Sequence, residues 1–158
     1  YGHNELILEW LRVEAGFKKM LKNDASTLKE FFGDNLNGSN NHAMFSSYSS
    51  WLFQALGGIT VAEEAVGADV ILISPSFTDT INFVDCWHQT IRGRIECRWR
   101  RYKKGIELVI KVPFNLKKCT LKLPKVYQLN KQLPAPIDCD TYHHFYDITD
   151  AGEIKVLL

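Results

Sequence analysis

Two ionisable side chains, Glu30 and His42, stand in patterns that suit chemistry. Glu30 ends the run Thr27-x-x-Glu30, which is typical of a capping box, where the Thr and Glu side chains satisfy backbone amides at the start of a helix. A carboxylate in the first turn of a helix is also kept ionised by the helix dipole and the free amides, so it can accept a proton. The spacing therefore predicts either a helix cap or a general base, and it does not separate the two.

His42 follows the polar run Ser39-Asn40-Asn41, any member of which could cap the next helix. A histidine in the first turn of a helix is typically exposed or part of the cap. A loop rich in Gly, Asn and Asp that leads to a histidine is also typical of sugar pockets, where it presents hydrogen-bond donors. Both readings stay open for His42.

Other chemistry finds little support. The cysteines are spaced 11, 22 and 20 residues apart with no C-x-x-C pair, so we expect buried free thiols, with one or two disulfides or a metal site as alternatives: Cys86, Cys97, Cys119 and Cys139. His143 and His144 are adjacent on a predicted extended segment and point to opposite faces, which makes them poor ligands for one metal. No phosphate-binding loop, nucleophile elbow or helical H-E-x-x-H motif occurs. We therefore expect no cofactor and no bound metal.

The densest charge run, residues 92–104, mixes arginine and lysine with Trp99 and Tyr102. Such mixing is used to bind nucleic acid. The run also alternates as a strand with one wet face requires, Glu96 and Glu107 dilute its charge, and the net charge of the chain is only +1. We interpret the run as a solvated strand face and expect neither nucleic acid nor a membrane as partner.

The first third of the chain has helical periodicity. Apolar residues recur at steps of four and three through Leu6, Trp10, Val13, Phe17 and Met20, and again from Met44 to Ala55, where Gly57-Gly58 is a suitable stop. A short helical start is expected over residues 27–32. The helices are apolar on more than one side, so they should bury this surface against further helices. We interpret residues 1–65 as the last helices of a larger, incomplete domain.

After residue 66 the period becomes two. Strands are predicted at Val70–Ser74, Ile81–Trp87, Arg94–Arg100, Ile106–Val112, Lys118–Leu123 and Glu153–Leu157, with a hairpin turn at Lys103-Lys104-Gly105. Six or so short strands with regular turns favour an antiparallel β-sandwich over residues 66–158. The predicted fold class is therefore α+β, with N-terminal helices followed by this sandwich. The start Tyr1-Gly2-His3-Asn4 shows no targeting signal, so we expect a mature product or a fragment and assign no compartment.

Two motifs add a resemblance. The run MLKNDASTLKE, residues 20–30, resembles the M-L-E-x-G-A-T-T-L-W-E motif of bacterial α-L-rhamnosidases, and SNNHAMFSSYSSWL, residues 39–52, is similar to their S-x-N-H-Y-A-x-G-A-V-x-x-W-L, both without a gap. Shorter similarities follow at residues 56–59, 67–77, 89–101 and 112–124. The resemblance covers nearly the whole chain and is weakest before residue 17 and between residues 125 and 146.

The resemblance implies the end of an α/α toroid, which carries the active site in that family, followed by the C-terminal sandwich. Such enzymes remove terminal α-L-rhamnose with inversion, using an acid and a base about 6.5–9.5 Å apart. Glu30 falls on the family's general base, and His42 with Asn41 falls on its sugar contact. The general acid belongs to a segment upstream of Tyr1, so the chain alone is expected to be inactive.

Four positions depart from the family motifs: Lys29 replaces Trp, Asp24 replaces Gly, Ala43 replaces Tyr and Ser46 replaces Gly. Lys29 removes an apolar wall for the sugar and weakens Glu30 as a base. The expected partners are a rhamnose-containing glycan, the upstream remainder of the catalytic domain and, for the isolated chain, a second copy bound through residues 4–21. The alternative function is a non-catalytic module, carbohydrate-binding or purely structural, formed by the β-rich part, with Glu30 as a cap alone.

Overall fold

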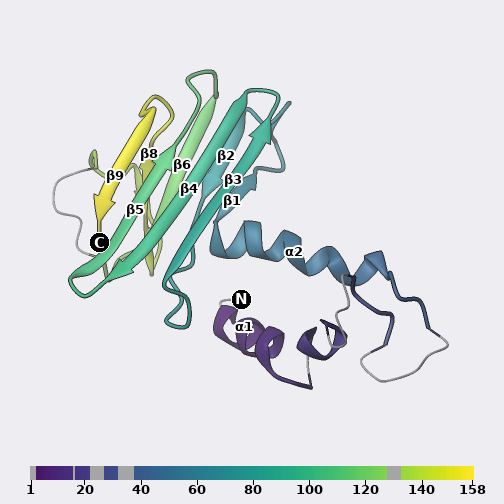
Figure 1. The fold of residues 1–158 in the computed structure, drawn as a ribbon. Coiled ribbons are helices and arrows are strands. Elements are labelled where there is room, and N and C mark those ends of the chain that lie inside the picture. Colours follow the sequence, from purple (N-terminus) through teal and green to yellow (C-terminus); the bar gives the residue numbers. More distant parts are fainter. Residues whose placement is uncertain (1–2, 16, 22–26, 32–37, 128–132) are drawn as a thin grey trace. The chain divides into compact units, whose positions relative to one another are not determined.

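The computed structural model describes residues 3–15, 17–21, 27–31, 38–127 and 133–158. Its contacts divide the chain into two compact units (Figure 1). The helical unit comprises residues 1–52 together with residues 78–80, and the sandwich unit comprises residues 53–77 and 81–158. No described helix has the length and apolar character that a membrane span needs.

The first predicted helix is interrupted. The α-helix α1 covers Asn4–Arg12, and the 3₁₀-helix η1 covers Phe17–Leu21. Val13 has an extended backbone, with φ −69° and ψ 146°, so the periodic run from Leu6 to Met20 is not one helix. Val13 is β-branched and a glycine follows at position 16, and both residue types are weak helix formers.

The second predicted helix is confirmed as one helical run of mixed winding. It consists of the 3₁₀-helix η2 (Ala43–Ser47), the α-helix α2 (Tyr48–Trp51) and the π-helical turn η3 (Leu52–Leu56). The short helix predicted at residues 27–32 is wrong, because residues 27–31 contain no helix; Phe32 lies outside the described residues.

The helix α1 is anchored to residues 78–80, which belong to the same unit. Glu5 Oε1 accepts a hydrogen bond from the Asp79 amide at 2.5 Å, and Glu5 Oε2 accepts one from the Thr80 hydroxyl at 2.8 Å. Arg12 Nη2 donates to the Thr80 carbonyl at 3.1 Å. The hydrogen bond from the Thr80 hydroxyl is the main cause that lowers the pKa of Glu5. These bonds place residues 78–80 with the helices rather than with the strands that they connect.

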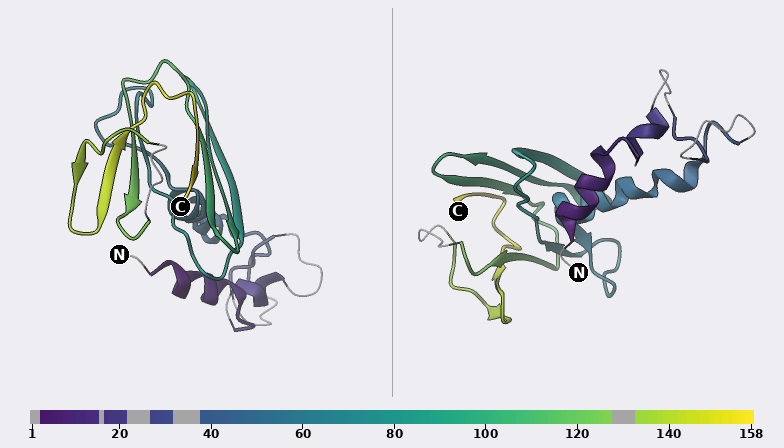
Figure 2. Two further views of the ribbon diagram at one scale, coloured as in Figure 1. Left: turned by 90° about the vertical axis from the view of Figure 1, so that its left-hand side faces the viewer. Right: turned by 90° about the horizontal axis from the view of Figure 1, so that it is seen from below.

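The sandwich unit consists of two sheets that face each other (Figure 2). The five-stranded sheet has the order β1-β2-β6-β8-β7, and the four-stranded sheet has the order β3-β4-β5-β9. The strands are β1 Ile59–Val61, β2 Val70–Ile73, β3 Phe83–Thr90, β4 Gly93–Tyr102, β5 Gly105–Lys111, β6 Lys118–Pro124, β7 Asp138–Cys139, β8 His143–Asp147 and β9 Glu153–Leu157. The predicted β-sandwich is therefore confirmed.

Strand pairing is antiparallel with one exception among the described strands. Strand β2 pairs with β6 in parallel, with Val70 opposite Lys118 and Ile73 opposite Leu121. The six predicted strands are all present, and the sequence did not reveal β1, β7 and β8. The sheet begins with β1, before residue 66, while the division of the chain into domains at residues 65 and 66 stays a prediction.

Residue alternation in β4 and β5 fills the space between the sheets. Ile95, Cys97 and Trp99 of β4 are buried, while the residues between them face outward. The predicted turn is confirmed, because Tyr102 pairs with Gly105 across Lys103 and Lys104. The core also takes buried residues from the opposite sheet, namely Ile71, Ile73, Cys119, Leu121, Leu123 and Tyr146.

Trp99 joins this core to the end of the helical run. Its side chain is 1% exposed, and its Nε1 donates to the Leu56 carbonyl at 3.1 Å. The Phe77 ring meets it edge-on, with the ring centroids 5.5 Å apart. Gly58 then turns the chain toward β1 with φ +73°, where a Cβ atom would lie 2.3 Å from the Pro75 nitrogen.

Candidate functional site

The segment that carries Glu30 pairs with the segment that carries His42. The Glu30 amide donates to the Ser39 carbonyl at 2.9 Å, and the His42 amide donates to the Leu28 carbonyl at 2.8 Å. The Thr27 hydroxyl donates to the Asn40 carbonyl. Two stretches separated by a Gly- and Asn-rich segment of the sequence are thus held side by side by backbone hydrogen bonds.

This pairing overturns the capping box. In that motif the Thr27 hydroxyl would accept from the Glu30 amide, and the Glu30 carboxylate would accept from the Thr27 amide. Here the Glu30 amide binds Ser39 and the Thr27 hydroxyl binds Asn40. The capping box does not form because residues 39–42 offer backbone hydrogen-bond partners that a short helix at this position would leave unused.

The carboxylate of Glu30 is held at one oxygen. The Ser39 amide donates to Oε2 at 2.9 Å, so Glu30 binds Ser39 through both its backbone and its side chain. Glu30 is half-buried. Among the described residues no hydrogen bond reaches Oε1, which leaves that oxygen able to accept from a water or a ligand. An anchored, half-buried carboxylate of this kind is suited to proton transfer.

The neighbouring site residues lie on the second stretch. The Asn41 backbone amide donates to the Ser39 hydroxyl at 3.1 Å, and Asn41 is exposed. His42 is half-buried and lies directly before η2. Lys29, next to Glu30, is half-buried, and Ala43 is exposed. Asp24 lies outside the described residues, as does the side chain of Ser46.

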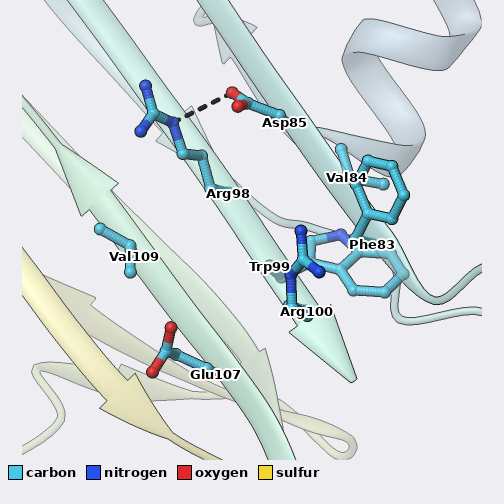
Figure 3. A pocket seen from close by; sticks show the side chains of 8 residues that line it. All are labelled: Phe83, Val84, Asp85, Arg98, Trp99, Arg100, Glu107 and Val109. Carbon is cyan, nitrogen blue, oxygen red and sulfur yellow. Dashed lines mark ion pairs between the residues drawn. The ribbon is translucent and has the colours of Figure 1, made fainter. Parts of the chain in front are cut away.

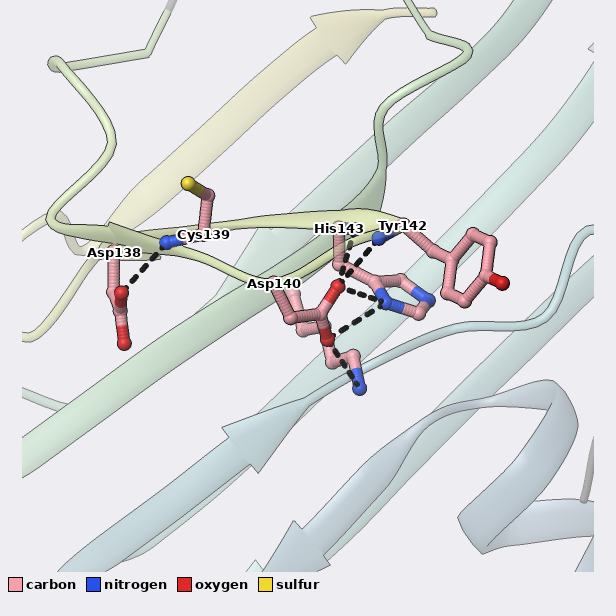
Figure 4. A network of polar contacts seen from close by, with 6 residues as sticks. Asp138, Cys139, Asp140, Tyr142 and His143 are labelled. Atoms are coloured by element: carbon pink, nitrogen blue, oxygen red, sulfur yellow. Dashed lines mark hydrogen bonds and ion pairs between the residues drawn. The ribbon is translucent and has the colours of Figure 1, made fainter.

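A second polar cluster closes the turn between β7 and β8 (Figure 4). Asp140 Oδ1 accepts from the Tyr142 amide at 2.7 Å and from the His143 amide at 2.6 Å, and it lies 3.0 Å from His143 Nδ1. These hydrogen bonds, the one from the Tyr142 amide first, lower the pKa of Asp140 to about 2. Asp140 was not predicted from the sequence, although an aspartate whose side chain can accept from the backbone amide two residues later is a recognised turn signal.

The two adjacent histidines have separate partners, as their opposite directions predict. His143 is bound to Asp140, whereas His144 Nδ1 lies 3.3 Å from the Tyr146 hydroxyl. Within the part of the chain that the structure describes, no three His, Cys, Asp or Glu side chains gather as a metal ion would require. The Asp140 cluster is therefore explained as a turn lock.

The cysteines are free thiols. Cys86, Cys97 and Cys119 are buried, as predicted, whereas Cys139 is exposed on β7. Burial raises the pKa of Cys119 to about 12 and raises that of Cys97 further. These two buried thiols are packing residues, because a thiol must ionise to act as a nucleophile.

The family of the sandwich follows from comparison with known proteins. Residues 61–134 match the family described as the bacterial alpha-L-rhamnosidase C-terminal domain. This part of the chain is similar to that family. The family match covers most of the sandwich strands, from the end of β1 to β6, and confirms the resemblance to α-L-rhamnosidases.

Two curated relatives carry the same family name. The chain is 28% identical over 75 residues to an alpha-L-rhamnosidase of Formosa agariphila, covering 48% of this chain and 8% of the relative. It is 28% identical over 90 residues to an alpha-L-rhamnosidase of an Alteromonas species, covering 57% of this chain and 10% of the relative. The chain thus spans about a tenth or less of the length of these proteins. Both relatives are named alpha-L-rhamnosidase.

Solved rhamnosidase structures share the fold. An α-L-rhamnosidase from Dictyoglumus thermophilum matches with a TM-score of 0.83 and 19% identity over 99% of this chain and 19% of its own. The Streptomyces avermitilis α-L-rhamnosidase complexed with L-rhamnose matches with a TM-score of 0.81 and 16% identity, over 99% of this chain and 16% of its own. At such identities the likeness concerns the fold alone.

Proposed function

We propose that the chain is the C-terminal part of a glycoside hydrolase that removes terminal α-L-rhamnose with inversion. The match of residues 61–134 to the rhamnosidase C-terminal family carries the proposal, and the names of the curated relatives supply the substrate class. In this proposal residues 1–65 are the last helices of an α/α toroid, and residues 66–158 are the domain that follows it. The substrate is a rhamnose-containing glycan or glycoside.

Glu30 is the proposed general base. It would take a proton from a water molecule while that water attacks the anomeric carbon on the face opposite the leaving oxygen, which inverts the configuration. The Ser39 amide supports this role, because it holds Oε2 and leaves Oε1 to receive the proton. The new bond joins the water oxygen to the sugar, and the leaving oxygen takes a proton from a general acid in the upstream part of the enzyme.

His42 and Asn41 are the proposed sugar contacts. The His42 amide is bonded to the Leu28 carbonyl of the Glu30 segment, and the Asn41 backbone amide is bonded to Ser39, which itself binds Glu30. A sugar held by these side chains would therefore keep a set position relative to the carboxylate. Fixed placement of a substrate beside a catalytic group is itself a large part of catalysis. The isolated chain should be inactive, because inversion needs both carboxyl groups around one bond.

The exposed apolar stripe of α1 supports a larger helical domain. Leu6 is 62% exposed and Trp10 45%, one turn apart on α1, and Val13, which follows the helix, is 40% exposed. In the intact enzyme this stripe would pack against upstream helices, and in the isolated chain it would bring two copies together. Sedimentation velocity on the isolated chain at high concentration would detect the dimer, and a monomer throughout would count against it.

The catalytic proposal is tested in the intact enzyme with an aryl α-L-rhamnoside as substrate. Glu30→Gln keeps the shape and the hydrogen bond to Ser39 but cannot accept the proton, so kcat should fall by about 10³-fold or more. Azide needs no base, so it should restore turnover of Glu30→Ala and yield a glycosyl azide of inverted configuration. Proton NMR of the first sugar released reports the configuration directly.

Glu64→Gln is the matched control, because Glu64 is an exposed glutamate on a turn of the sandwich unit. It should leave kcat unchanged. Full activity of Glu30→Gln would remove Glu30 from the mechanism, and retention of configuration in the product would remove inversion.

A further inference from the structure

A hollow lies on the outer face of the four-stranded sheet (Figure 3). Two cross-strand rows line it, Phe83, Arg100 and Glu107 in one and Asp85, Arg98 and Val109 in the other, as the registers of β3, β4 and β5 require. Its volume is about 340 Å³. Ligand pockets start at about 300 Å³, so this hollow suits one sugar-sized ring rather than a long ligand.

Most charges in the hollow are already neutralised and held in place. Arg98 Nε lies 3.0 Å from Asp85 Oδ1, and Arg98 Nη2 lies 2.7 Å from Glu96 Oε2. Glu107 Oε2 lies 2.8 Å from Lys155 Nζ, and this hydrogen bond raises the pKa of Lys155. Carboxylates fixed in this way keep lone pairs that can accept from the hydroxyls of a sugar.

Arg100 is the exception in this hollow. No carboxylate of the described residues lies within ion-pair distance of it. Its guanidinium instead lies over the Phe83 ring, 5.1 Å from the centroid, and Phe83 is 56% exposed. Arg94 makes the informative contrast, because it lies over Trp87 at 4.5 Å but is also paired with Glu96 at 2.8 Å, and it does not line the hollow.

We propose that this hollow binds a sugar residue that carries a carboxylate. The carboxylate would pair with the Arg100 guanidinium, whose planar fork matches it in two parallel hydrogen bonds. The sugar ring would lie against the exposed surface of Phe83, and its hydroxyls would donate to Asp85 and Glu107. Among the described residues that line the hollow, only one cation lacks an acidic partner, and two carboxylates flank it. One negative charge therefore fits the site, whereas a row of phosphates does not.

This site is separate from Glu30, and it does not depend on the proposed hydrolysis. All its lining residues belong to the sandwich unit. Binding by the isolated chain, which is expected to be inactive, therefore tests the site alone. Failure here would leave the proposed function untouched, and failure of the Glu30 test would leave this site untouched.

The experiment titrates the isolated chain with a methyl glycoside of galacturonic acid, which has one ring and one carboxylate, and, separately, with its methyl ester, which removes the charge but keeps the ring. Backbone amide NMR shifts should map to β3, β4 and β5 around the hollow, and the acid should bind at least about tenfold more tightly than the ester, as a charge-assisted hydrogen bond implies. Arg100→Ala should erase the difference between acid and ester, and Phe83→Ala should weaken both.

Arg94→Ala is the control and should bind like the unaltered chain. Arg100→Gln, which keeps part of the aliphatic stem but not the charge, gives a second reading if Arg100→Ala unfolds, with far-UV circular dichroism as the check of folding. The proposal would be overturned if the acid and the ester bound equally tightly, or if the amide NMR shifts mapped to residues outside the hollow. It would also be overturned if Arg94→Ala lost as much affinity for the acid as Arg100→Ala. Tighter binding of a single-stranded oligonucleotide than of the acid at the same salt would overturn it as well.

Discussion

Replacing Trp99 by Phe tests whether one buried hydrogen bond fixes the end of the helical run on the sandwich core. The indole Nε1 donates to the Leu56 carbonyl at 3.1 Å, and the side chain is 1% exposed. Phenylalanine keeps the edge-on contact with Phe77 but has no donor, so the Leu56 carbonyl loses this partner. Water has no ready access to replace it.

The magnitude has two parts. A buried acceptor that loses its partner costs about 1–3 kcal/mol. The smaller ring also leaves a space, which adds about 1 kcal/mol, as in other small reductions of a core side chain. The free energy of unfolding should therefore fall by about 2–4 kcal/mol. With a urea m-value of about 2 kcal/mol/M, the midpoint falls by about 1–2 M.

Urea unfolding of the isolated chain, followed by far-UV circular dichroism, measures this change without relying on tryptophan fluorescence. Trp87→Phe is the matched control, because Trp87 is 48% exposed on the outer face of the same sheet. It should change the free energy of unfolding by less than about 0.5 kcal/mol, as surface changes usually do. Equal shifts in the two variants would refute the reasoning from the Leu56 hydrogen bond.

Two further predictions concern titratable groups. In the folded chain a charged, water-soluble disulfide reagent should label Cys139 rapidly and the buried cysteines only after unfolding. Rapid labelling of more than one thiol per chain at neutral pH would contradict the burial of the other three cysteines. Asp140→Asn should lower the thermal midpoint at pH 7, because the folded carboxyl has a depressed pKa of about 2 and so stabilises the fold above its unfolded value of about 4. That deficit should shrink as the pH falls from about 4 to about 2, in scans compared with Asp150→Asn, and a deficit that stays constant over this range would exclude the ionised turn lock.

The strands that could be predicted are those whose pattern is set by the core. In β4 the alternation of Ile95, Cys97 and Trp99 with charged residues fixes both the strand and its inward face, and the turn after Tyr102 follows from its residues. Strands β1 and β7 contain three and two residues, too few for a period to appear. The parallel pairing of β2 with β6 depends on which distant segments meet, and no local pattern encodes that.

The candidate site shows the same division. The residue types of Glu30 and His42 and their order could be read from the sequence, and the motifs around them gave the family resemblance. The capping box was wrong because it pairs Thr27 and Glu30 with each other, whereas Ser39 and Asn40, nine or more residues further along the chain, are their partners. The hollow at Arg100 could not be predicted, since it depends on which carboxylates the neighbouring strands pair with other cations. The catalytic role of Glu30 and the sugar contacts of His42 and Asn41 stay predictions.

The order of the strands along the chain also predicts the order in which they pair during folding. Along the chain, β1 and β2 belong to the five-stranded sheet, β3, β4 and β5 to the four-stranded sheet, and β6, β7 and β8 again to the five-stranded sheet. The last strand, β9, pairs with β5 in the four-stranded sheet. The hairpins β3–β4 and β4–β5 have two-residue turns and can form within about 1–10 μs. Strand β2 must wait for β6 across the 44 residues that separate Ile73 from Lys118, so its pairing is the slow, non-local step. Until β9 arrives, β5 is an open edge, and a nascent chain that lacks its last six residues would expose that edge to other chains.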